Sequence, residues 1–195
     1  MTLTAGPDGR LRCGWALTAP EYLDYHDHEW GRPVTSVSGL YERLSLEAFQ
    51  SGLAWITILR KRENFRAAFA GFQPDRVARF GAADVERLMN DPGIVRNRTK
   101  IEATIANARV VEGLGEDFAR LILGHAVPDR PRPTAGETVR ATSPESVALA
   151  AGLKAAGIRF VGPTTAYALM QAVGLVDDHL DGCFVPPPWK EGDPG

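Results

Sequence analysis

The 195-residue sequence has few cysteines, no long apolar run and no excess of positive charge, and each absence excludes a class of protein. Its two cysteines, Cys13 and Cys183, are too few for a disulfide scaffold, and a disulfide between them is not expected in a reducing cytoplasm. The apolar runs fall far short of the about 20 residues that span a membrane. No charged start followed by an apolar segment indicates a signal peptide, so we expect a cytoplasmic protein without a membrane partner.

Composition places the chain among ordinary globular proteins. The apolar content of 44% and the charged content of 24% are typical of that class. A chain of this length can bury a sizeable core as one domain or as two small lobes. The formal net charge of −2 gives no overall attraction to nucleic acid. A nucleic-acid function would therefore require a local basic patch.

Helix caps and breakers dominate the chain, and no strand pattern of useful length is present except a short candidate at 158–161. We therefore predict an all-α protein of many short helices. Residues 1–11 are expected to be a flexible tail, residues 12–185 the folded domain, and residues 186–195 a second flexible tail. The expected helices span residues 18–30, 54–69, 74–80, 83–90, 100–111, 118–123, 144–156 and 163–173, and a further helix, capped by Ser36 or Ser38, carries Glu47.

Glu47 stands in the middle of an apolar helical face. At helical spacing it shares that face with Leu40, Leu44, Ser51, Ala54, Trp55 and Ile58. A carboxylate in such a place must be paired, be neutral or face a polar cavity. One interpretation is an ordinary glutamate, paired or at the edge of the stripe. The other is a functional carboxylate, which is favoured by the Trp on the same face and by Gly52, which interrupts the helical pattern.

Aromatic residues precede this helix. Tyr22, Tyr25 and Trp30 would gather around Glu47 and Trp55 if the first helix packs nearby. Plain core packing is the common fate of such residues. A carboxylate with aromatic faces is also the arrangement expected around a flat cationic ligand. The sequence pattern leaves both interpretations open.

Cysteine and histidine occur near both ends of the chain. Cys13 and His26 lie early, and His179 and Cys183 lie late. Two thiolates and two imidazoles would form a closed tetrahedral zinc set, which is structural rather than catalytic. The spacing is not that of a classical zinc finger, so two buried cysteines with unrelated histidines remain an alternative. His28 is a further imidazole close to His26.

A tight turn at Asp91-Pro92-Gly93 separates two predicted helices. The backbone N–H groups from Gly93 to Val95 would point outward at a helix start and could grip a phosphate. Arg96, Arg98 and Lys100 surround the turn and could steer a nucleic-acid backbone. An ordinary helix–turn–helix corner with solvated basic residues is the alternative.

Together these segments resemble one known family, the 3-methyladenine DNA glycosylase I family of the helix-hairpin-helix DNA glycosylases. The resemblance covers about residues 12–183 and is specific, because many motifs occur in the same order. They are Arg12-Cys13-Gly14-Trp15, Tyr25-His26-Asp27, Glu29-Trp30-Gly31, Gly52-Leu53-Ala54-Trp55, Lys61-Arg62-Glu63-Asn64-Phe65, Gly93-Ile94-Val95-Arg96, Phe160-Val161-Gly162, Met170-Gln171-Ala172, Gly174-Leu175-Val176 and Asp178-His179.

The resemblance implies a monofunctional enzyme that flips 3-methyladenine out of alkylated duplex DNA and hydrolyses its glycosidic bond, without a nucleotide cofactor. It implies a helix-hairpin-helix fold of two lobes, acting as a monomer. It also implies the site residues. Structural zinc would be bound by Cys13, His26, His179 and Cys183. The base pocket would consist of Tyr22, Tyr25, Trp30, Glu47 and Trp55, with Glu47 catalytic. DNA would be contacted by Gly93, Val95, Arg96, Arg98 and Lys100, and by a wedge at Gly52 and Leu53.

Two other classes stay open. A bifunctional glycosylase/lyase would need a nucleophilic lysine beside the hairpin, where Lys100 is the nearby candidate. A zinc-stapled DNA-binding module without activity would have no need of a caged carboxylate, so Glu47 and the aromatic residues argue against it. Many relatives on this scaffold use an aspartate after the hairpin, but the resemblance does not make Asp117 catalytic.

Overall fold

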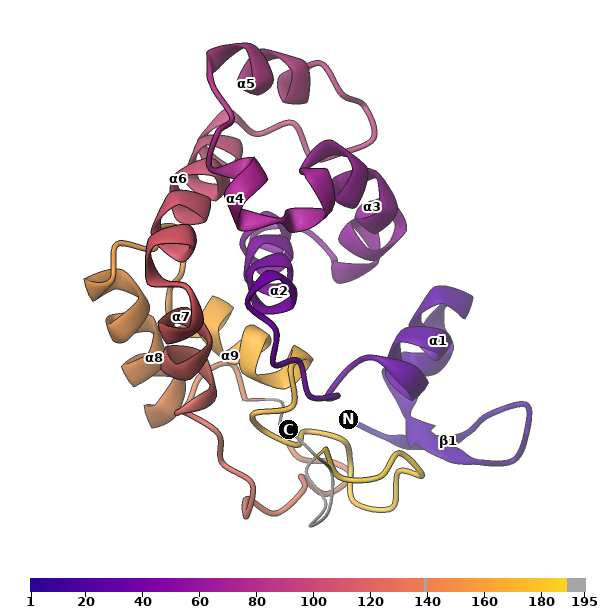
Figure 1. Cartoon of the computed structure of the whole chain (residues 1–195). Helices are drawn as coiled ribbons and strands as arrows, with labels where there is room; N and C mark the ends of the chain where they lie inside the picture. Colours follow the sequence, from indigo (N-terminus) through magenta and orange to yellow (C-terminus); the bar gives the residue numbers. More distant parts are fainter. Residues whose placement is uncertain (139, 189–195) are drawn as a thin grey trace.

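The computed structural model describes residues 1–138 and 140–188 and shows a mostly helical chain (Figure 1). None of the helices in these two ranges has the length and apolarity needed to cross a membrane. Within these ranges there are two short strands, β1 (Leu3–Ala5) and β2 (Leu11–Cys13), and two 3-10 helices, η1 (Gly14–Thr18) and η2 (Ala70–Phe72). The α-helices are α1 (Pro20–His28), α2 (Val37–Gln50), α3 (Trp55–Ala68), α4 (Pro74–Val77), α5 (Ala82–Met89), α6 (Arg98–Leu114), α7 (Glu116–Leu123), α8 (Pro144–Ala155) and α9 (Pro163–Ala172).

Helix boundaries follow the caps that the sequence indicates. Ser36 begins α2, where its hydroxyl accepts a hydrogen bond from the N–H of Gly39 at 3.2 Å. Ser143 and Ser146 form a reciprocal capping box at the start of α8. Proline in the first turn of α8 and of α9 fits a position where the missing N–H has no helical partner. The predicted helices are therefore confirmed, with ends shifted by a few residues.

Helix α2 is the centre of the molecule and packs against α3, α6, α7 and α9 (Figure 1). Leu40, Tyr41, Leu46 and Phe49 on this helix are fully buried. The Tyr41 hydroxyl donates to the backbone oxygen of Thr104 at 2.9 Å, which satisfies its only polar atom in the core. Because so much of α2 is surrounded, a polar side chain on its buried surface must meet either a partner or a cavity.

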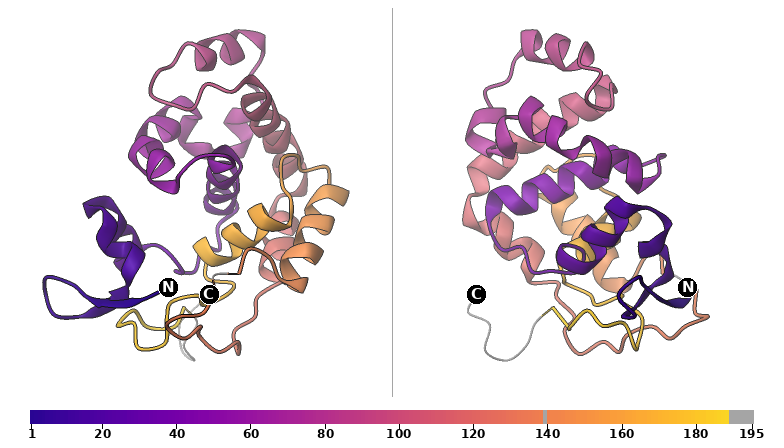
Figure 2. Two further views of the ribbon diagram at one scale, coloured as in Figure 1. Left: turned by 180° about the vertical axis from the view of Figure 1, so that it is seen from behind. Right: turned by 90° about the vertical axis from the view of Figure 1, so that its right-hand side faces the viewer.

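The expected flexible tail at residues 1–11 is wrong, because these residues form most of a β-hairpin. Strand β1 pairs antiparallel with β2, and Gly9 turns the chain with a φ of 78°. The hairpin packs on the C-terminal segment, where the Phe184 N–H donates to the backbone oxygen of Leu11 at 2.9 Å (Figure 2). Contacts from the far end of the chain thus order a segment that looks unstructured locally. The predicted tail at 186–195 lies mostly outside the described residues.

Candidate active site

A pocket of about 430 Å³ lies between the N-terminal segment, α2 and α9. The structure brings together all five residues that the sequence suggests for a base pocket, from α1 and the segment after it, α2 and α3. Its lining consists of Met1, Trp15, Tyr22, Tyr25, Trp30, Glu47, Gln50, Trp55, Ala168, Gln171 and Asp178. Trp15, Gln171 and Asp178 were missed as pocket residues, although each lies in a motif that the resemblance includes.

The aromatic rings form one connected group. Trp15 packs edge-on against Tyr22 and Trp30, with ring centroids 5.5 and 5.1 Å apart, and Tyr25 lies 5.5 Å from Trp55. The Tyr22 hydroxyl accepts a hydrogen bond from the Ile56 N–H at 2.9 Å, which ties α1 to the start of α3. Such a group offers the faces and edges on which a flat ligand can pack.

The Glu47 carboxyl group is the most unusual feature of the pocket. It is only 6% exposed, and none of the described residues donates a hydrogen bond to it. Burial raises the pKa of Glu47 to about 8, although the charge of Arg43, one turn earlier, works in the opposite direction. The carboxyl group is therefore mostly neutral at pH 7. A bound cation would favour its ionised form.

Replacing Glu47 with glutamine should stabilise the fold at alkaline pH. Between the ordinary value of 4.5 and about 8, the folded state keeps the Glu47 proton while the unfolded state releases it. The free energy of unfolding therefore falls as pH rises through this window, and the amide removes that loss. We expect Glu47→Gln to exceed the wild type by on the order of 4 kcal/mol at pH 8, and by about 1 kcal/mol at most at pH 5. Urea unfolding at both pH values measures the difference, and an equal gain at both would contradict it.

The indole N–H of Trp55 supports a ligand at this place. Its Nε1 atom is buried and has no hydrogen-bond partner among the described residues. An indole nitrogen can only donate, and leaving a buried donor unpaired costs about 1–3 kcal/mol. A ligand with an acceptor atom near Trp55 would remove this cost.

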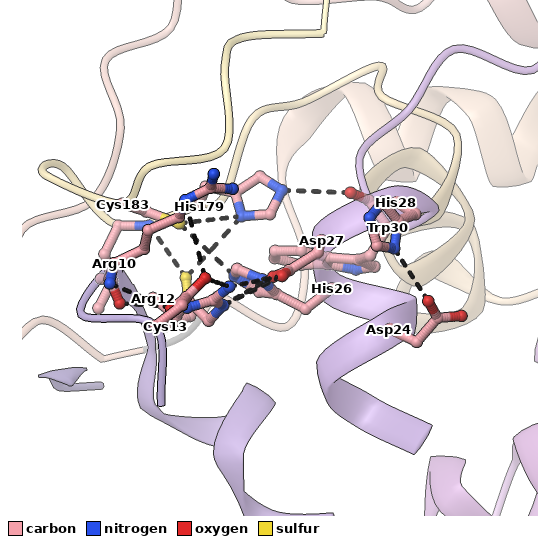
Figure 3. A network of polar contacts seen from close by, with 12 residues as sticks. Arg10, Arg12, Cys13, Asp24, His26, Asp27, His28, Trp30, His179 and Cys183 are labelled. Atoms are coloured by element: carbon pink, nitrogen blue, oxygen red, sulfur yellow. Dashed lines mark hydrogen bonds and ion pairs between the residues drawn. The ribbon is translucent and has the colours of Figure 1, made fainter. Parts of the chain in front are cut away.

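The four predicted metal ligands form one buried cluster (Figure 3). Their ligand atoms lie within 4.8 Å of one another. The Cys183 sulfur lies 3.6 Å from His26 Nε2 and 3.7 Å from His179 Nδ1, and the Cys13 sulfur lies 3.9 Å from His179 Nδ1. Sulfur and nitrogen atoms on a tetrahedral zinc ion are about 3.5 Å apart, so this donor set fits such an ion. Hydrogen bonds from the Cys13 thiol and from the two imidazoles lower the pKa of Cys183, which favours the thiolate that a metal requires.

Outer contacts orient both imidazoles toward the cluster. His26 Nδ1 lies 2.8 Å from the Asp27 carboxylate, and His179 Nε2 lies 3.1 Å from the backbone oxygen of Trp30. Arg12 holds Asp27 in turn, through three hydrogen bonds of 2.8 to 3.1 Å. Metal-binding histidines show this pattern in proteins. His28 pairs with Asp24 on the surface instead and is not part of the cluster (Figure 3).

The turn between α5 and α6 does not present all of the free backbone N–H groups that were expected to bind a phosphate. The Gly93 N–H donates to the Asp91 carboxylate at 2.7 Å, and the Ile94 N–H is directed at the backbone oxygen of Asp91 at 3.5 Å. The prediction of free N–H groups is therefore wrong at these two residues. The glycine has a packing reason, because a Cβ there would lie 3.0 Å from the Cβ of Asn64 on α3. Arg96 and Arg98 remain exposed beside the turn.

Lys100 is not placed as the sequence analysis predicts, which was beside a nucleic-acid backbone. Its ammonium group donates to the backbone oxygens of Phe49 and Ser51 at 2.9 and 2.7 Å, where it caps the end of α2. The residue is 8% exposed, and burial lowers the pKa of its amine. Lys100 therefore stabilises the segment around Ser51 rather than facing a nucleic acid.

The segment after α2 projects from the surface. Residues 51–54 are exposed, and Leu53 shows 39% of its surface. Gly52 has a φ of 84° and open space where a side chain would be, so its role is to turn the backbone. The Gln50 amide, which lines the pocket, donates to the backbone oxygen of Leu53 at 2.8 Å. The projecting Leu53 therefore lies beside the pocket.

A second turn, between α8 and α9, leaves the N–H groups of two successive residues unpaired within the part of the chain that the structure describes. Within the described residues, the backbone N–H groups of Val161 and Gly162 have no partner, and α9 follows directly. Phe160 is 42% exposed and has a φ of 63°, which is rare for an aromatic residue and marks a strained turn. Lys154 and Arg159 line the same surface hollow as Ser51. The expected short strand at 158–161 does not form, although Phe160, Val161 and Gly162 lie in a motif of the family resemblance.

The sequence matches a known family over most of its length. A family model described as methyladenine glycosylase matches residues 15–186. The chain is 47% identical over 178 residues to DNA-3-methyladenine glycosylase 1 of Escherichia coli. This alignment covers 88% of this chain and 95% of that protein. It is 42% identical over 184 residues to the DNA-3-methyladenine glycosylase of Haemophilus influenzae, with 88% and 96% covered.

Solved structures agree in fold. One crystal structure of a 3-methyladenine DNA glycosylase I matches with a TM-score of 0.85 and 45% identity, covering 90% of this chain and all of that one. The enzyme from Staphylococcus aureus matches with a TM-score of 0.85 and 33% identity, covering 92% and 98%. Agreement over nine-tenths of the chain places this fold in the class of the helical DNA glycosylases. Within that class, the chain belongs to the methyladenine glycosylase family.

Proposed function

We propose that this protein excises 3-methyladenine from alkylated DNA as the first step of base excision repair. The observation that carries the proposal is the buried Glu47 carboxyl group, which faces a pocket of aromatic rings and has no partner among the described residues. The structure of a single-substitution variant of a 3-methyladenine DNA glycosylase I in complex with 3-methyladenine matches this chain with a TM-score of 0.83 and 33% identity. An ordinary core would pair such a carboxyl group, whereas a pocket for a cation leaves it available.

The chemistry follows from the charge of the damaged base. A purine methylated at N3 is cationic, so its glycosidic bond is already weak and the leaving group needs no proton. The enzyme must flip the nucleotide out, at a cost of a few kcal/mol, and hold the charged base. Glu47 would pair with the cation while Trp55, Tyr22, Tyr25 and Trp30 surround its ring, each cation–π contact contributing about 0.5–2 kcal/mol. Neutral adenine gains less from the same pocket, which provides selectivity.

We also propose that the cysteine–histidine cluster binds structural zinc. Four protein ligands leave no open position for a substrate, which is typical of structural sites. The ion would join the N-terminal segment, which carries Cys13 and His26, to the C-terminal segment, which carries His179 and Cys183. Trp15 and Trp30 lie close to His26, so the ion would also support the aromatic side of the pocket.

For the DNA backbone, we propose that the α8–α9 turn is the hairpin of the helix-hairpin-helix fold. Its free N–H groups at the start of a helix can bind a phosphate, and Lys154 and Arg159 supply positive charge. It adjoins the segment with Gly52 and Leu53, which would fill the space left by the flipped nucleotide. Arg96 and Arg98 would steer the backbone from the α5–α6 turn, where the N–H of Val95 also has no partner among the described residues.

Removing both cations beside the α8–α9 turn should weaken duplex binding and its salt dependence. Each phosphate contact contributes about 0.9 to the slope of log K against log salt. The double variant Lys154→Ala/Arg159→Ala should therefore lose about 2 from that slope, as measured by titrations of duplex DNA at several salt concentrations. Arg76→Ala/Arg79→Ala, which removes two exposed charges on and just after α4, is the matched control. Equal losses in both variants would contradict the proposed interface.

The proposed reaction is monofunctional, since Lys100 is buried on backbone oxygens and is not free to attack the sugar. A single chain supplies every residue of the pocket, which supports a monomer. We place its action in the cytoplasm, where the DNA of the bacterial relatives lies. Incubation with methylated duplex DNA tests the proposal on the DNA side. We expect abasic sites to accumulate without strand breaks and without a borohydride-trapped adduct. A trapped adduct would show a lyase, and intact DNA would show a binding module.

A further inference from the structure

Gln171 is a pocket residue whose amide orientation is fixed by a carboxylate. It lies near the end of α9, which packs against α2, so it and Glu47 reach the same pocket from neighbouring helices. Its Nε2 donates to Asp178 Oδ2 at 2.7 Å. Gln50, the other amide in the pocket, is instead held at the exposed carbonyl of Leu53.

Asp178 is itself held rigidly. The Tyr167 hydroxyl donates to Oδ2 at 2.7 Å, and the Arg130 guanidinium donates to Oδ1 at 3.1 Å. The carboxylate is 4% exposed, and its partners are two neutral donors and one cation. Since an ionised carboxylate only accepts hydrogen bonds, the Gln171 amide must present its nitrogen to Asp178. A flipped amide would bring its oxygen against the carboxylate and lose a charge-assisted hydrogen bond.

The fixed nitrogen leaves the other end of the amide as an acceptor. Among residues 1–138 and 140–188, no donor contacts the Oε1 atom of Gln171, and the side chain lines the pocket. Adenine carries an amino group at ring position 6, with two N–H donors, whereas guanine carries an oxygen there. Glu47 can accept from one N–H of such an amine, which leaves the second N–H for another acceptor.

We propose that Gln171 is a specificity-determining residue, whose side-chain oxygen, held by Asp178, accepts a hydrogen bond from the 6-amino group of the bound purine. A 6-oxo purine such as 3-methylguanine places an acceptor against this oxygen, and the amide cannot rotate to accommodate it. A site built to pair with one hydrogen-bonding group rejects an analogue that leaves the site unpaired. This inference rests on the proposed function and gives it a substrate preference.

Competition within one reaction tests the inference. Duplex DNA treated with a methylating agent contains both lesions, and chromatography of the released bases gives the ratio of 3-methyladenine to 3-methylguanine. This ratio does not depend on how much of a variant is folded. We expect Gln171→Met to lower the ratio about tenfold, by slowing release of 3-methyladenine. Asp178→Asn should also lower it, because an asparagine can donate to a rotated Gln171 and so admits the 6-oxo purine.

Gln50→Met is the matched control and should keep the wild-type ratio. An unchanged ratio in Gln171→Met, or an equal change in Gln50→Met, would overturn the inference while leaving the proposed function intact. If the wild-type protein releases neither base, the proposed function itself fails. The two failures are therefore distinguishable in the same experiment.

Discussion

Replacing Glu47 with glutamine should lower the rate of 3-methyladenine excision about 100-fold without unfolding the protein. The Glu47 carboxylate would pair with the cationic base among the aromatic rings of the pocket. Removing one partner of a buried charge pair costs about 2–5 kcal/mol, or about 30-fold and more in rate. The fold is retained because a neutral carboxyl group and an amide have the same shape, and burial already raises the pKa of Glu47 to about 8. Single-turnover kinetics on a duplex with one lesion measure the effect.

Asp117→Asn is the control for that experiment. Asp117 is an exposed carboxylate on α7 that pairs with Arg120 and does not line the pocket. We expect its excision rate to stay within about twofold of the wild type, since surface substitutions change stability by about 0.5 kcal/mol at most. A large loss in Asp117→Asn together with a small loss in Glu47→Gln would reject the pocket assignment.

Loss of the metal should destabilise the whole molecule. One ion would connect segments about 150 residues apart in sequence, from His26 to His179. Metal binding free energy is folding free energy when the unfolded chain has no site. We expect Cys183→Ser to lose its zinc and to melt about 10 °C lower, which corresponds to about 4 kcal/mol for a chain of this size. Elemental analysis and thermal unfolding measure the two quantities.

His28→Ala is the control for Cys183→Ser, because it removes the imidazole of α1 that lies outside the cysteine–histidine cluster. His28 is exposed and pairs with Asp24, so its variant should keep one zinc per chain and the wild-type melting temperature. A wild-type protein without bound metal, or a Cys183→Ser variant as stable as the wild type, would refute the structural zinc site.

Most helices could be predicted from the sequence because their signals are local, whereas the set of pocket residues depended on the family resemblance. Ser36, Ser143 and the prolines that start α8 and α9 determine where helices begin, and side-chain periodicity places Glu47 on a buried face. The gathering of Cys13 and His26 with His179 and Cys183 depended on the family resemblance. Spacing alone left that cluster undecided.

The remaining features depend on contacts between distant segments. Strand β1 pairs with β2, which is bonded to the C-terminal segment at Leu11, and Lys100 is turned inward by the carbonyl groups at the end of α2. No local pattern distinguishes such a lysine from a solvated one. Likewise, none shows that the Asp91 carboxylate accepts a hydrogen bond from the Gly93 N–H. Gln171 and Asp178 were missed for the same reason, since their pairing with the pocket exists only in the fold.

Identification of the base released from methylated duplex DNA is the decisive test of whether this protein excises 3-methyladenine. Purified protein is incubated with the DNA, and the soluble fraction is separated by chromatography with mass detection. We expect free 3-methyladenine as the main product of the wild type and almost none from Glu47→Gln under the same conditions. Absence of 3-methyladenine from the products of a folded, metal-containing wild type would contradict it.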